Sequence, residues 1–289
     1  MIYIDRKSDF LKIARENHFA IPAFNFSDPI ELLAVVEAAQ ELDAPVMCAT
    51  NMQSFNEQRH HICGALAEGI RKEYENIPTL VHLDHSSSVE LCKEAIDVGY
   101  KSVMIDCSKL SLDENIKNTR EVVEYAHPRD VMVEAEIGQI LGRNEEGNFD
   151  GGDYLGKPED ARRVAEESGC DSLAIGIGNA HGFYKGKPKL HFEILEAVTA
   201  ITDIPLVLHG GTGIPVEDVQ RAIRTGISKV NVGTQLHYTY LTTVQEQLKN
   251  GLKSNNVFEH MLPAREAIRS VVKEWITICM ADGKAGLFR

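Results

Sequence analysis

The chain has 289 residues, of which 43% are hydrophobic and 25% are charged. This usage is that of an ordinary globular protein and excludes disorder, collagen and coiled coil as the main architecture. Its 30 basic and 43 acidic residues give a formal net charge of −13. Because the chain is acidic overall, we expect it to bind neither nucleic acid nor an anionic membrane, and any bound phosphate must be held by a local feature.

The cysteines and the first residues indicate a cytoplasmic protein. The 6 cysteines form no CxxC pair, and several lie in apolar runs, where cysteine behaves as a small hydrophobic residue. Met1–Arg6 lack the basic and then apolar pattern of a signal peptide, and no apolar run reaches the ~18 residues of a membrane span. We therefore expect reduced thiols and a cytoplasmic location.

Apolar runs rich in Val, Ile and Leu predict strands that are buried on both faces. In chain order they are Ile21–Asn25, Pro45–Ala49, Thr79–Leu83, Ser102–Asp106, Val131–Glu136, Asp171–Ile177, Pro205–His209 and Lys229–Val232. Amphipathic segments between them predict helices, for example at Ile30–Leu42, Val89–Val98, Leu112–Ala126, Pro158–Ser168 and Pro215–Thr225. Glycines that follow three of these helices are stop signals.

Strands that alternate with helices in this number predict an α/β fold, a single-domain (β/α)8 TIM barrel over residues 1–289. A doubly wound sheet is the alternative, although it more often has fewer strands and a glycine fingerprint after the first. Residues 140–157 are rich in Gly, Asp and Glu and predict a long mobile loop after the fifth strand. The tail Thr234–Arg289 predicts a helical C-terminal extension in which Pro263 opens one helix.

Polar side chains fall at the carboxyl ends of the predicted strands, where barrel enzymes carry their catalytic residues. The set is Asn25, Asp84, His85, Asp106, Glu136, His209 and Asn231, with His181 a few residues past the sixth strand. A hydrogen-bonded structural cluster would explain the histidines, but three imidazoles with an open position favour a catalytic zinc site at His85, His181 and His209. His82 shares a strand face with Asp84 and is either a packed strand residue or a support for the metal ligands.

Glycine-rich turns after the last two strands indicate where a phosphate binds. Gly210-Gly211-Thr212-Gly213 follows the seventh strand and Asn231-Val232-Gly233-Thr234 ends the eighth, each before a predicted helix. Barrel enzymes often hold phosphate with backbone amides of these two loops. Gly182 and Lys185 are expected to add to this site, although Lys185 also fits a solvated loop charge.

With these motifs the sequence resembles the class II, zinc-dependent ketose-bisphosphate aldolases, which include fructose- and tagatose-bisphosphate aldolases. The matching motifs are Val81-His-Leu-Asp-His85, Ser102-Val-Met-Ile-Asp-Cys-Ser108, Val133-Glu-Ala-Glu-Ile-Gly138, Gly178-Asn-Ala-His-Gly182, Leu206-Val-Leu-His-Gly-Gly-Thr-Gly213 and Lys229-Val-Asn-Val-Gly-Thr234. They occur in order, and the likeness extends from about Phe10 to the C-terminus. The resemblance implies reversible cleavage of a ketose 1,6-bisphosphate to dihydroxyacetone phosphate and glyceraldehyde 3-phosphate, as in glycolysis.

The resemblance also implies roles for individual residues. It implies that His85, His181 and His209 bind Zn2+, that Asp84 is the acid/base at the C3–C4 bond, and that Asp106 and Glu136 belong to an alternative or second metal site of some members. The residues that match positions around the dihydroxyacetone phosphate are Gly182, Gly210, Thr212, Asn231 and Thr234. From their places at strand ends and in the neighbouring loops, we also expect Asn25, Lys185, Gly211 and Gly233 to bind substrate. Gly182, Gly210 and Thr212 match positions near a monovalent cation, Na+ or K+, in some members. By resemblance we also expect a homodimer or homotetramer.

The sequence departs from the family at the loop acid and at the residues expected around the aldehyde. Asn144 stands where the family places a catalytic loop Glu, and an amide cannot transfer that proton. We expect Glu145 to replace it, with Glu146 as the neighbouring choice. Arg265 and Arg269 are the candidates to hold a distal phosphate. The alternatives are an aldolase for a different ketose 1-phosphate with another aldehyde product, and a non-catalytic sugar-phosphate-binding accessory subunit.

Overall fold

The computed structural model describes residues 9–51, 55–56, 60–140, 154–249, 251–252 and 254–288. Parallel strands close into a barrel in chain order, with β8 pairing back onto β1, so the predicted (β/α)8 TIM barrel is confirmed. The strands are β1 (Ile21–Asn25), β2 (Val46–Asn51), β3 (Thr79–Ser86), β4 (Ser102–Ile105), β5 (Met132–Ile137), β6 (Ser172–Ile175), β7 (Leu206–Leu208) and β8 (Ile227–Val232). Nearly all of their residues are buried, as the uninterrupted apolar runs predict.

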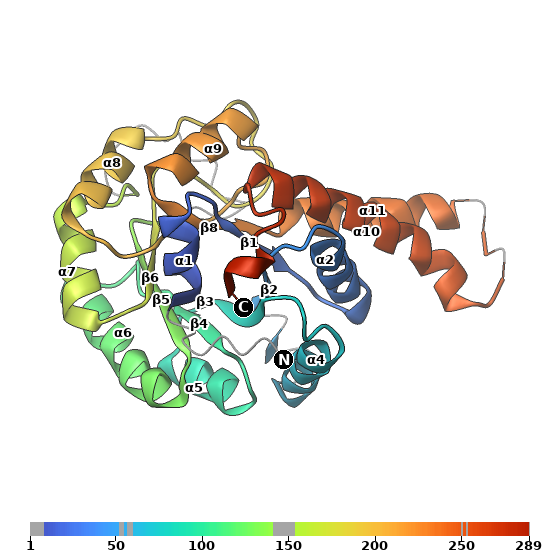
Figure 1. Ribbon diagram of the computed structural model, residues 1–289, viewed down its shortest axis with the longest axis horizontal. Helices are drawn as coiled ribbons and strands as arrows, with labels where there is room; N and C mark the ends of the chain where they lie inside the picture. Colours follow the sequence, from blue (N-terminus) through green and yellow to red (C-terminus); the bar gives the residue numbers. More distant parts are fainter. Residues whose placement is uncertain are drawn as a thin grey trace.

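A ring of helices surrounds the barrel in Figure 1. These helices are α2 (Pro29–Glu41), α4 (His60–Glu73), α5 (Val89–Asp97), α6 (Leu112–Ala126), α7 (Pro158–Ser168), α8 (Phe192–Ile201) and α9 (Val216–Thr225), with a short turn η2 (His127–Arg129) after α6. Local signals fix where they begin. The Asp28 carboxylate accepts hydrogen bonds from the amides of Ile30 and Glu31 at 2.8 and 2.9 Å, and Ser111 and Glu114 form a capping box at the start of α6.

The amino-terminal end of the barrel is covered by α1 (Phe10–Glu16) and η3 (Ala285–Phe288). The rings of Phe10 and Phe288 lie 4.9 Å apart, and Phe19, just before β1, packs edge-on against Phe288 at 6.4 Å. This aromatic contact joins the two ends of the described chain and closes one mouth of the barrel. The carboxyl ends of the strands therefore remain as the mouth at which a site can form.

Two long C-terminal helices, α10 (Thr234–Leu248) and α11 (Val257–Ile278), lie side by side and project from the barrel (Figure 1). The prediction that Pro263 opens a helix is wrong, because α11 begins six residues earlier, at Val257. Asn256 caps this start, and its side chain accepts a hydrogen bond from the Phe258 amide at 3.1 Å. The missing amide of Pro263 costs only one bond, to the carbonyl of Glu259 in the first turn.

Most of the predicted loop at 140–157 falls on residues 141–153, which lie outside the described part, and Asn144, Glu145 and Glu146 lie there too. The chain on either side is held together at a narrow neck. The Gln139 amide donates to the Tyr154 carbonyl at 2.9 Å, and the Gly156 amide donates to the Gly176 carbonyl at 2.7 Å. A Cβ on Gly138 would lie 2.6 Å from the Gly156 nitrogen, so the neck requires glycine there.

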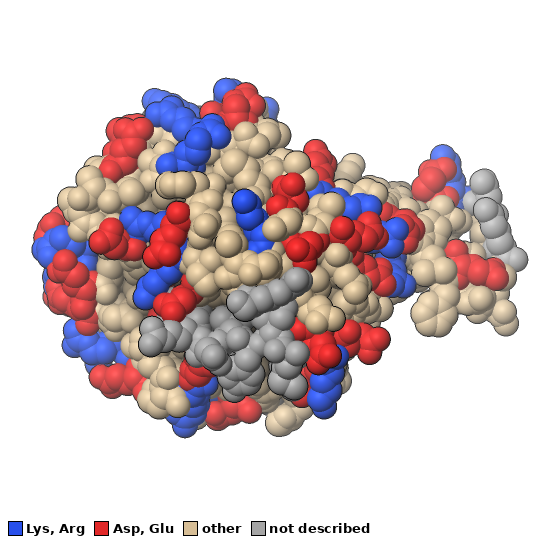
Figure 2. Space-filling model, viewed as in Figure 1, with Lys and Arg blue, Asp and Glu red and all other residues tan. Residues whose placement is uncertain are grey.

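The surface and the cysteines agree with the composition. Figure 2 shows acidic and basic side chains interspersed over the visible face, without a basic patch among the residues coloured there. All 6 cysteines are free thiols and buried. Among the described helices, none has the length and apolar character needed to cross a membrane.

Candidate metal centre

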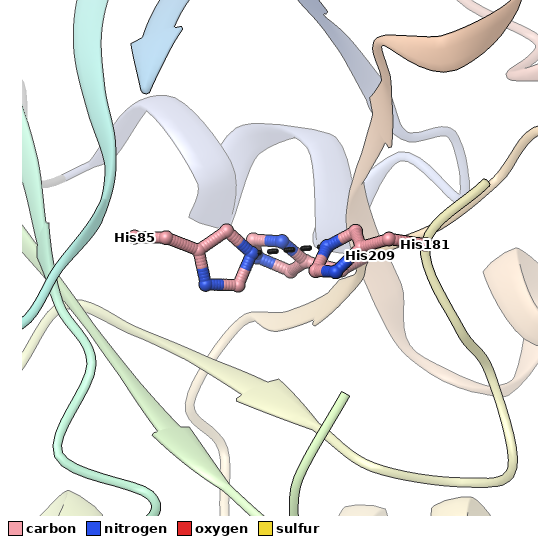
Figure 3. A group of neighbouring side chains, drawn as sticks. All are labelled: His85, His181 and His209. Atoms are coloured by element: carbon pink, nitrogen blue, oxygen red, sulfur yellow. Dashed lines mark hydrogen bonds between the residues drawn. The ribbon is translucent and has the colours of Figure 1, made fainter. Parts of the chain in front are cut away.

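Three histidines converge at the carboxyl ends of the strands. His85 lies in β3, His181 in the loop after β6, and His209 directly after β7. Each ring offers one nitrogen, and these nitrogens all lie within 4.8 Å of one another. Nε2 of His85 and Nε2 of His181 are 3.1 Å apart, and Figure 3 shows the three rings turned toward one another. The predicted convergence of these residues is therefore present in the structure.

An irregularity in β3 aims two consecutive side chains at this mouth. The pairing of β3 with β4 shifts between Leu83 and Ser86, and His85 adopts a left-handed conformation with φ of 50°. In a regular strand Asp84 and His85 would point to opposite faces. The bulge instead lets Asp84 reach the side chains of Asn25 and Asn231 while His85 reaches Asp106 and His181.

The loop that carries His181 is held against the next strand by specific hydrogen bonds. The Asn179 side chain accepts from the Ile177 amide and donates to the His209 carbonyl, both at 2.9 Å. The Tyr184 hydroxyl accepts from the Ala180 amide at 2.9 Å and donates to the carbonyl of Gly210 at 3.2 Å. These bonds fix His181 relative to His209 although no strand carries it.

Asp84 is a buried carboxylate held in its ionised form. Its Oδ2 accepts a hydrogen bond from the side-chain amide of Asn25, and its Oδ1 accepts one from the side-chain amide of Asn231, each at 3.0 Å. Burial alone would raise the pKa of Asp84, but the positive charges at His85 and Lys229 outweigh burial and hold it well below its ordinary value. A carboxylate fixed by two donors, 3.8 Å from Nδ1 of His209, is placed to exchange a proton beside the metal ligands.

The three histidines differ in how readily each ring takes up a second proton. Burial lowers the pKa of His85, but the charge on Asp84 and the hydrogen bond that His85 donates to Asp106 outweigh burial and raise it to about 10. Burial and the charge on His85 lower the pKa of His181 to about 3, and the same two causes lower the pKa of His209. A divalent cation can replace the proton on His85, because all three rings then present a lone pair.

Two acidic residues form a second group with His85. One atom each of His85, Asp106 and Glu136 lie within 4.8 Å of one another, and His85 Nδ1 is 3.1 Å from Asp106 Oδ2. Burial and the neighbouring Asp106 raise the pKa of Glu136 to about 8. Its buried Oε2 has no hydrogen-bond partner among the described residues. An uncompensated oxygen beside an imidazole and a carboxylate is the environment that a cation satisfies, so these donors and the three histidines fit a divalent metal.

The glycine-rich loops lie beside this centre. Gly182 and Gly210 have φ of 97° and 66°, and a Cβ on Gly210 would lie 2.1 Å from the Ala180 carbonyl. Thr212 accepts from the Gln235 amide at 3.3 Å in the first turn of α10, so the two predicted loops meet. A cavity of about 340 Å³ opens between His181, Gly182 and Thr234, with a rim of exposed aromatic residues at Phe183 and Tyr238.

The remaining predicted substrate residues lie around the same mouth. Gly211 donates its amide to the carbonyl of Asn231 at 3.0 Å, and Gly233 packs against Asn25, whose Oδ1 would be 3.0 Å from an added Cβ. Lys185 is exposed in the loop after β6, and its predicted role at the phosphate stays a prediction.

The arginines considered for a distal phosphate lie elsewhere. Arg265 Nε donates to Glu37 at 3.0 Å, and Arg269 pairs with Glu41 at 3.3 Å, so both side chains tie α11 to α2. These carboxylates neutralise the guanidinium groups, which argues against a role in holding a phosphate.

Sequence reasoning missed two residues behind the histidines. Glu134 and Lys229 are at most 1% exposed, and Lys229 Nζ donates to Glu134 at 2.7 Å. The alternation Glu134-Ala-Glu136 in β5 placed both acids on one face of the strand, which was the available signal. His82 is a packed strand residue in contact with Lys229 rather than with a metal ligand histidine.

Comparison with known proteins agrees with this geometry. Residues 5–284 match the family described as fructose-bisphosphate aldolase class-II. A fructose-bisphosphate aldolase of Staphylococcus epidermidis is 42% identical over 267 residues, which cover 90% of this chain and 91% of that protein, and one from Staphylococcus aureus is 40% identical over the same shares. The crystal structure of the YdjI aldolase from Escherichia coli K12 superposes with a TM-score of 0.84 at 29% identity, covering 96% of this chain and 98% of that one. The chain belongs to the class II fructose-bisphosphate aldolase family, whose members are metal-dependent aldehyde-lyases.

Proposed function

We propose that the protein cleaves fructose 1,6-bisphosphate reversibly to dihydroxyacetone phosphate and glyceraldehyde 3-phosphate, with Zn2+ held by His85, His181 and His209. The observation that carries the proposal is the convergence of these three rings beside the buried carboxylate of Asp84. The names of the two staphylococcal relatives support the choice of substrate. Tagatose 1,6-bisphosphate differs from fructose 1,6-bisphosphate only in configuration at C4, and no described residue separates the two sugars.

Different residues of the chain have separate roles in cleavage of the C3–C4 bond. Asp84 takes the proton of the C4 hydroxyl as the C3–C4 bond breaks and returns it in the condensation direction. Asn25 and Asn231 keep this carboxylate in place by donating to both of its oxygens. The bound zinc supplies Lewis-acid stabilisation of the negative charge that develops on the three-carbon fragment. Glu145 protonates C3 of that fragment, as the loop acid.

The loops after β6, β7 and β8 hold the phosphate of the three-carbon fragment. The backbone at Gly182, Gly210 and Gly211 leaves room for close approach, and hydroxyl groups come from Thr212 in the loop after β7 and Thr234 at the start of α10. We place Na+ or K+ at Gly182, Gly210 and Thr212, and an alternative or second divalent site at Asp106 and Glu136, whose unsatisfied oxygen supports it.

A coupled assay with each ketose bisphosphate tests the proposal. Cleavage of fructose 1,6-bisphosphate should disappear after complete metal removal with a chelator and return when Zn2+ is added. Full activity in protein shown to be free of metal would overturn the zinc mechanism, and cleavage of neither bisphosphate by zinc-loaded protein would overturn the choice of substrate.

A second candidate is an aldolase for a ketose 1-phosphate without a distal phosphate. The pairing of Arg265 and Arg269 with α2 favours it. This candidate predicts equal kcat/KM for fructose 1-phosphate and fructose 1,6-bisphosphate, whereas the first predicts a marked preference for the bisphosphate.

We further propose a cytoplasmic homodimer or homotetramer. The projecting helices and the connection between them carry large exposed apolar side chains, including Leu252 of the connection at 74% and Phe258 of α11 at 70% exposure, which support association of copies. Light scattering coupled to gel filtration measures the mass directly, and a monomer at micromolar concentration would contradict the proposal.

A further inference from the structure

A chain of buried polar side chains crosses the barrel interior behind the metal centre. Lys229 of β8 donates to Glu134 Oε2 of β5 at 2.7 Å and lies 3.2 Å from His82 Nε2 of β3. Glu134 Oε1 is in turn 2.8 Å from His209 Nε2. All four side chains are at most 1% exposed. A buried ion pair gives little net stability compared with apolar packing, so this pair calls for another explanation.

The direction of each hydrogen bond in this chain can be assigned. The ammonium of Lys229 can only donate, so Nε2 of His82 accepts and the ring proton of His82 lies on Nδ1, facing the Ser102 hydroxyl at 2.7 Å. Paired with Lys229, Glu134 is ionised and can only accept.

The same reasoning fixes the proton of His209. Because the carboxylate of Glu134 accepts, Nε2 of His209 carries the proton and Nδ1 carries the lone pair. Nδ1 faces the site, 3.2 Å from the Asn231 amide and 3.8 Å from Asp84 Oδ1. Without a carboxylate at Nε2, only the Asn231 amide at 3.2 Å from Nδ1 would favour this tautomer, and the neutral imidazole would also populate the other, in which Nδ1 is blocked by a proton.

We propose that Glu134, oriented by Lys229, is a positioning residue that fixes His209 in the one tautomer and ring orientation in which Nδ1 can bind zinc. The inference rests on the proposed zinc site. It extends that site to Glu134, which contacts the His209 nitrogen that does not bind zinc, and to Lys229, which contacts Glu134. Groups that hold the second nitrogen of a metal-binding histidine typically change metal affinity 10–100-fold when they are removed.

Zinc affinity of the apoprotein, measured by competition with a chromophoric chelator, tests this role without using activity. We expect Glu134→Gln to raise the zinc Kd by about 10–100-fold. Since Glu134→Gln leaves Lys229 unpaired, the double variant Glu134→Gln/Lys229→Met removes both charges and keeps a folded protein available, with the same weakening expected. Glu31→Gln is the matched control, because Glu31 is a 1% exposed carboxylate bonded at 2.7 Å to His237, which is none of the three ligands, and the zinc Kd of this variant should be unchanged.

Nitrogen NMR of the histidine rings supplies a readout that a merely structural role would not move. In wild-type apoprotein His209 should show the Nε2–H tautomer alone, and in the folded double variant it should show a mixture of both tautomers. An Nδ1–H tautomer in wild type, or an unchanged tautomer in the variant, would overturn the inference. So would a zinc Kd within about threefold of wild type, which is well below the expected change. If the wild-type protein itself failed to bind zinc, that result would contradict the proposed function and not this inference alone.

Discussion

Replacement of Asp84 by Asn tests the division of catalytic work most directly. The substitution keeps the shape of the side chain but removes the acceptor for the C4 hydroxyl proton. General acid–base groups contribute about 10²–10⁴-fold to rate, so cleavage should fall by that factor, or about 3–5 kcal/mol in the activation barrier. Exchange of the C3 proton of dihydroxyacetone phosphate with deuterated water involves no C4 hydroxyl and should stay within about tenfold of wild type.

The structure also predicts a stability cost for this variant and a control for it. Both oxygens of Asp84 accept from amide groups, of Asn25 and Asn231, and an Asn at position 84 would turn one donor toward another. The resulting unsatisfied pair should cost about 1–3 kcal/mol in unfolding free energy. The exchanged pair Asp84→Asn/Asn25→Asp restores donor to acceptor and should recover that stability without recovering cleavage. Cleavage within tenfold of wild type in zinc-loaded Asp84→Asn, or an equal loss of proton exchange, would refute the assigned role.

Three further predictions concern the metal and the backbone. Zinc affinity should rise about tenfold for each pH unit up to pH 10, because zinc displaces the proton that the raised pKa of about 10 keeps on His85. Buffered chelator competition measures the zinc Kd, and a Kd that does not change with pH would contradict this prediction. In urea unfolding His85→Gly should be about 1 kcal/mol more stable than His85→Ala, because alanine retains the penalty of the positive φ and glycine does not; equal stabilities would exclude backbone strain at this bulge. Gly210→Ala should lower the free energy of unfolding by more than about 2 kcal/mol, because the added Cβ meets the Ala180 carbonyl. Gly251→Ala is the control: Gly251 also has a positive φ but open space around it, so this variant should lose only about 1 kcal/mol. Similar melting temperatures for the two variants would show that the loop at Gly210 relaxes.

The sequence was sufficient for the barrel because each strand is an apolar run of its own. Parallel strands buried on both faces leave little polar alternation, and β1 (Ile21–Asn25) was predicted to the residue. The site could also be predicted from the sequence, because His209 directly follows a strand and the carboxyl ends of the strands meet at one mouth of the barrel. His181 was the harder residue, since its position depends on the bonds of Asn179 and Tyr184.

Other features depend on tertiary contacts that a local pattern does not contain. The bulge at His85 follows from pairing of β3 with β4, and periodicity alone would have turned that ring away from the site. Lys229 lies in an apolar run, and only the closed barrel brings it to Glu134. Proline is common at helix starts, so the local pattern predicts that Pro263 opens a helix, but the Asn256 cap sets the start of α11 earlier.

The neck at Gln139 and Tyr154 joins the barrel to the segment that contains the proposed loop acid, Glu145. Because the bonds at 2.9 and 2.7 Å close the base, the thirteen or so residues beyond them add little closure entropy when their number changes. An inserted or exchanged segment there would leave the sheet and the histidines undisturbed. The loop can therefore be exchanged, and the specificity for the acceptor aldehyde can change with it, while the metal-binding residues of the barrel stay as they are.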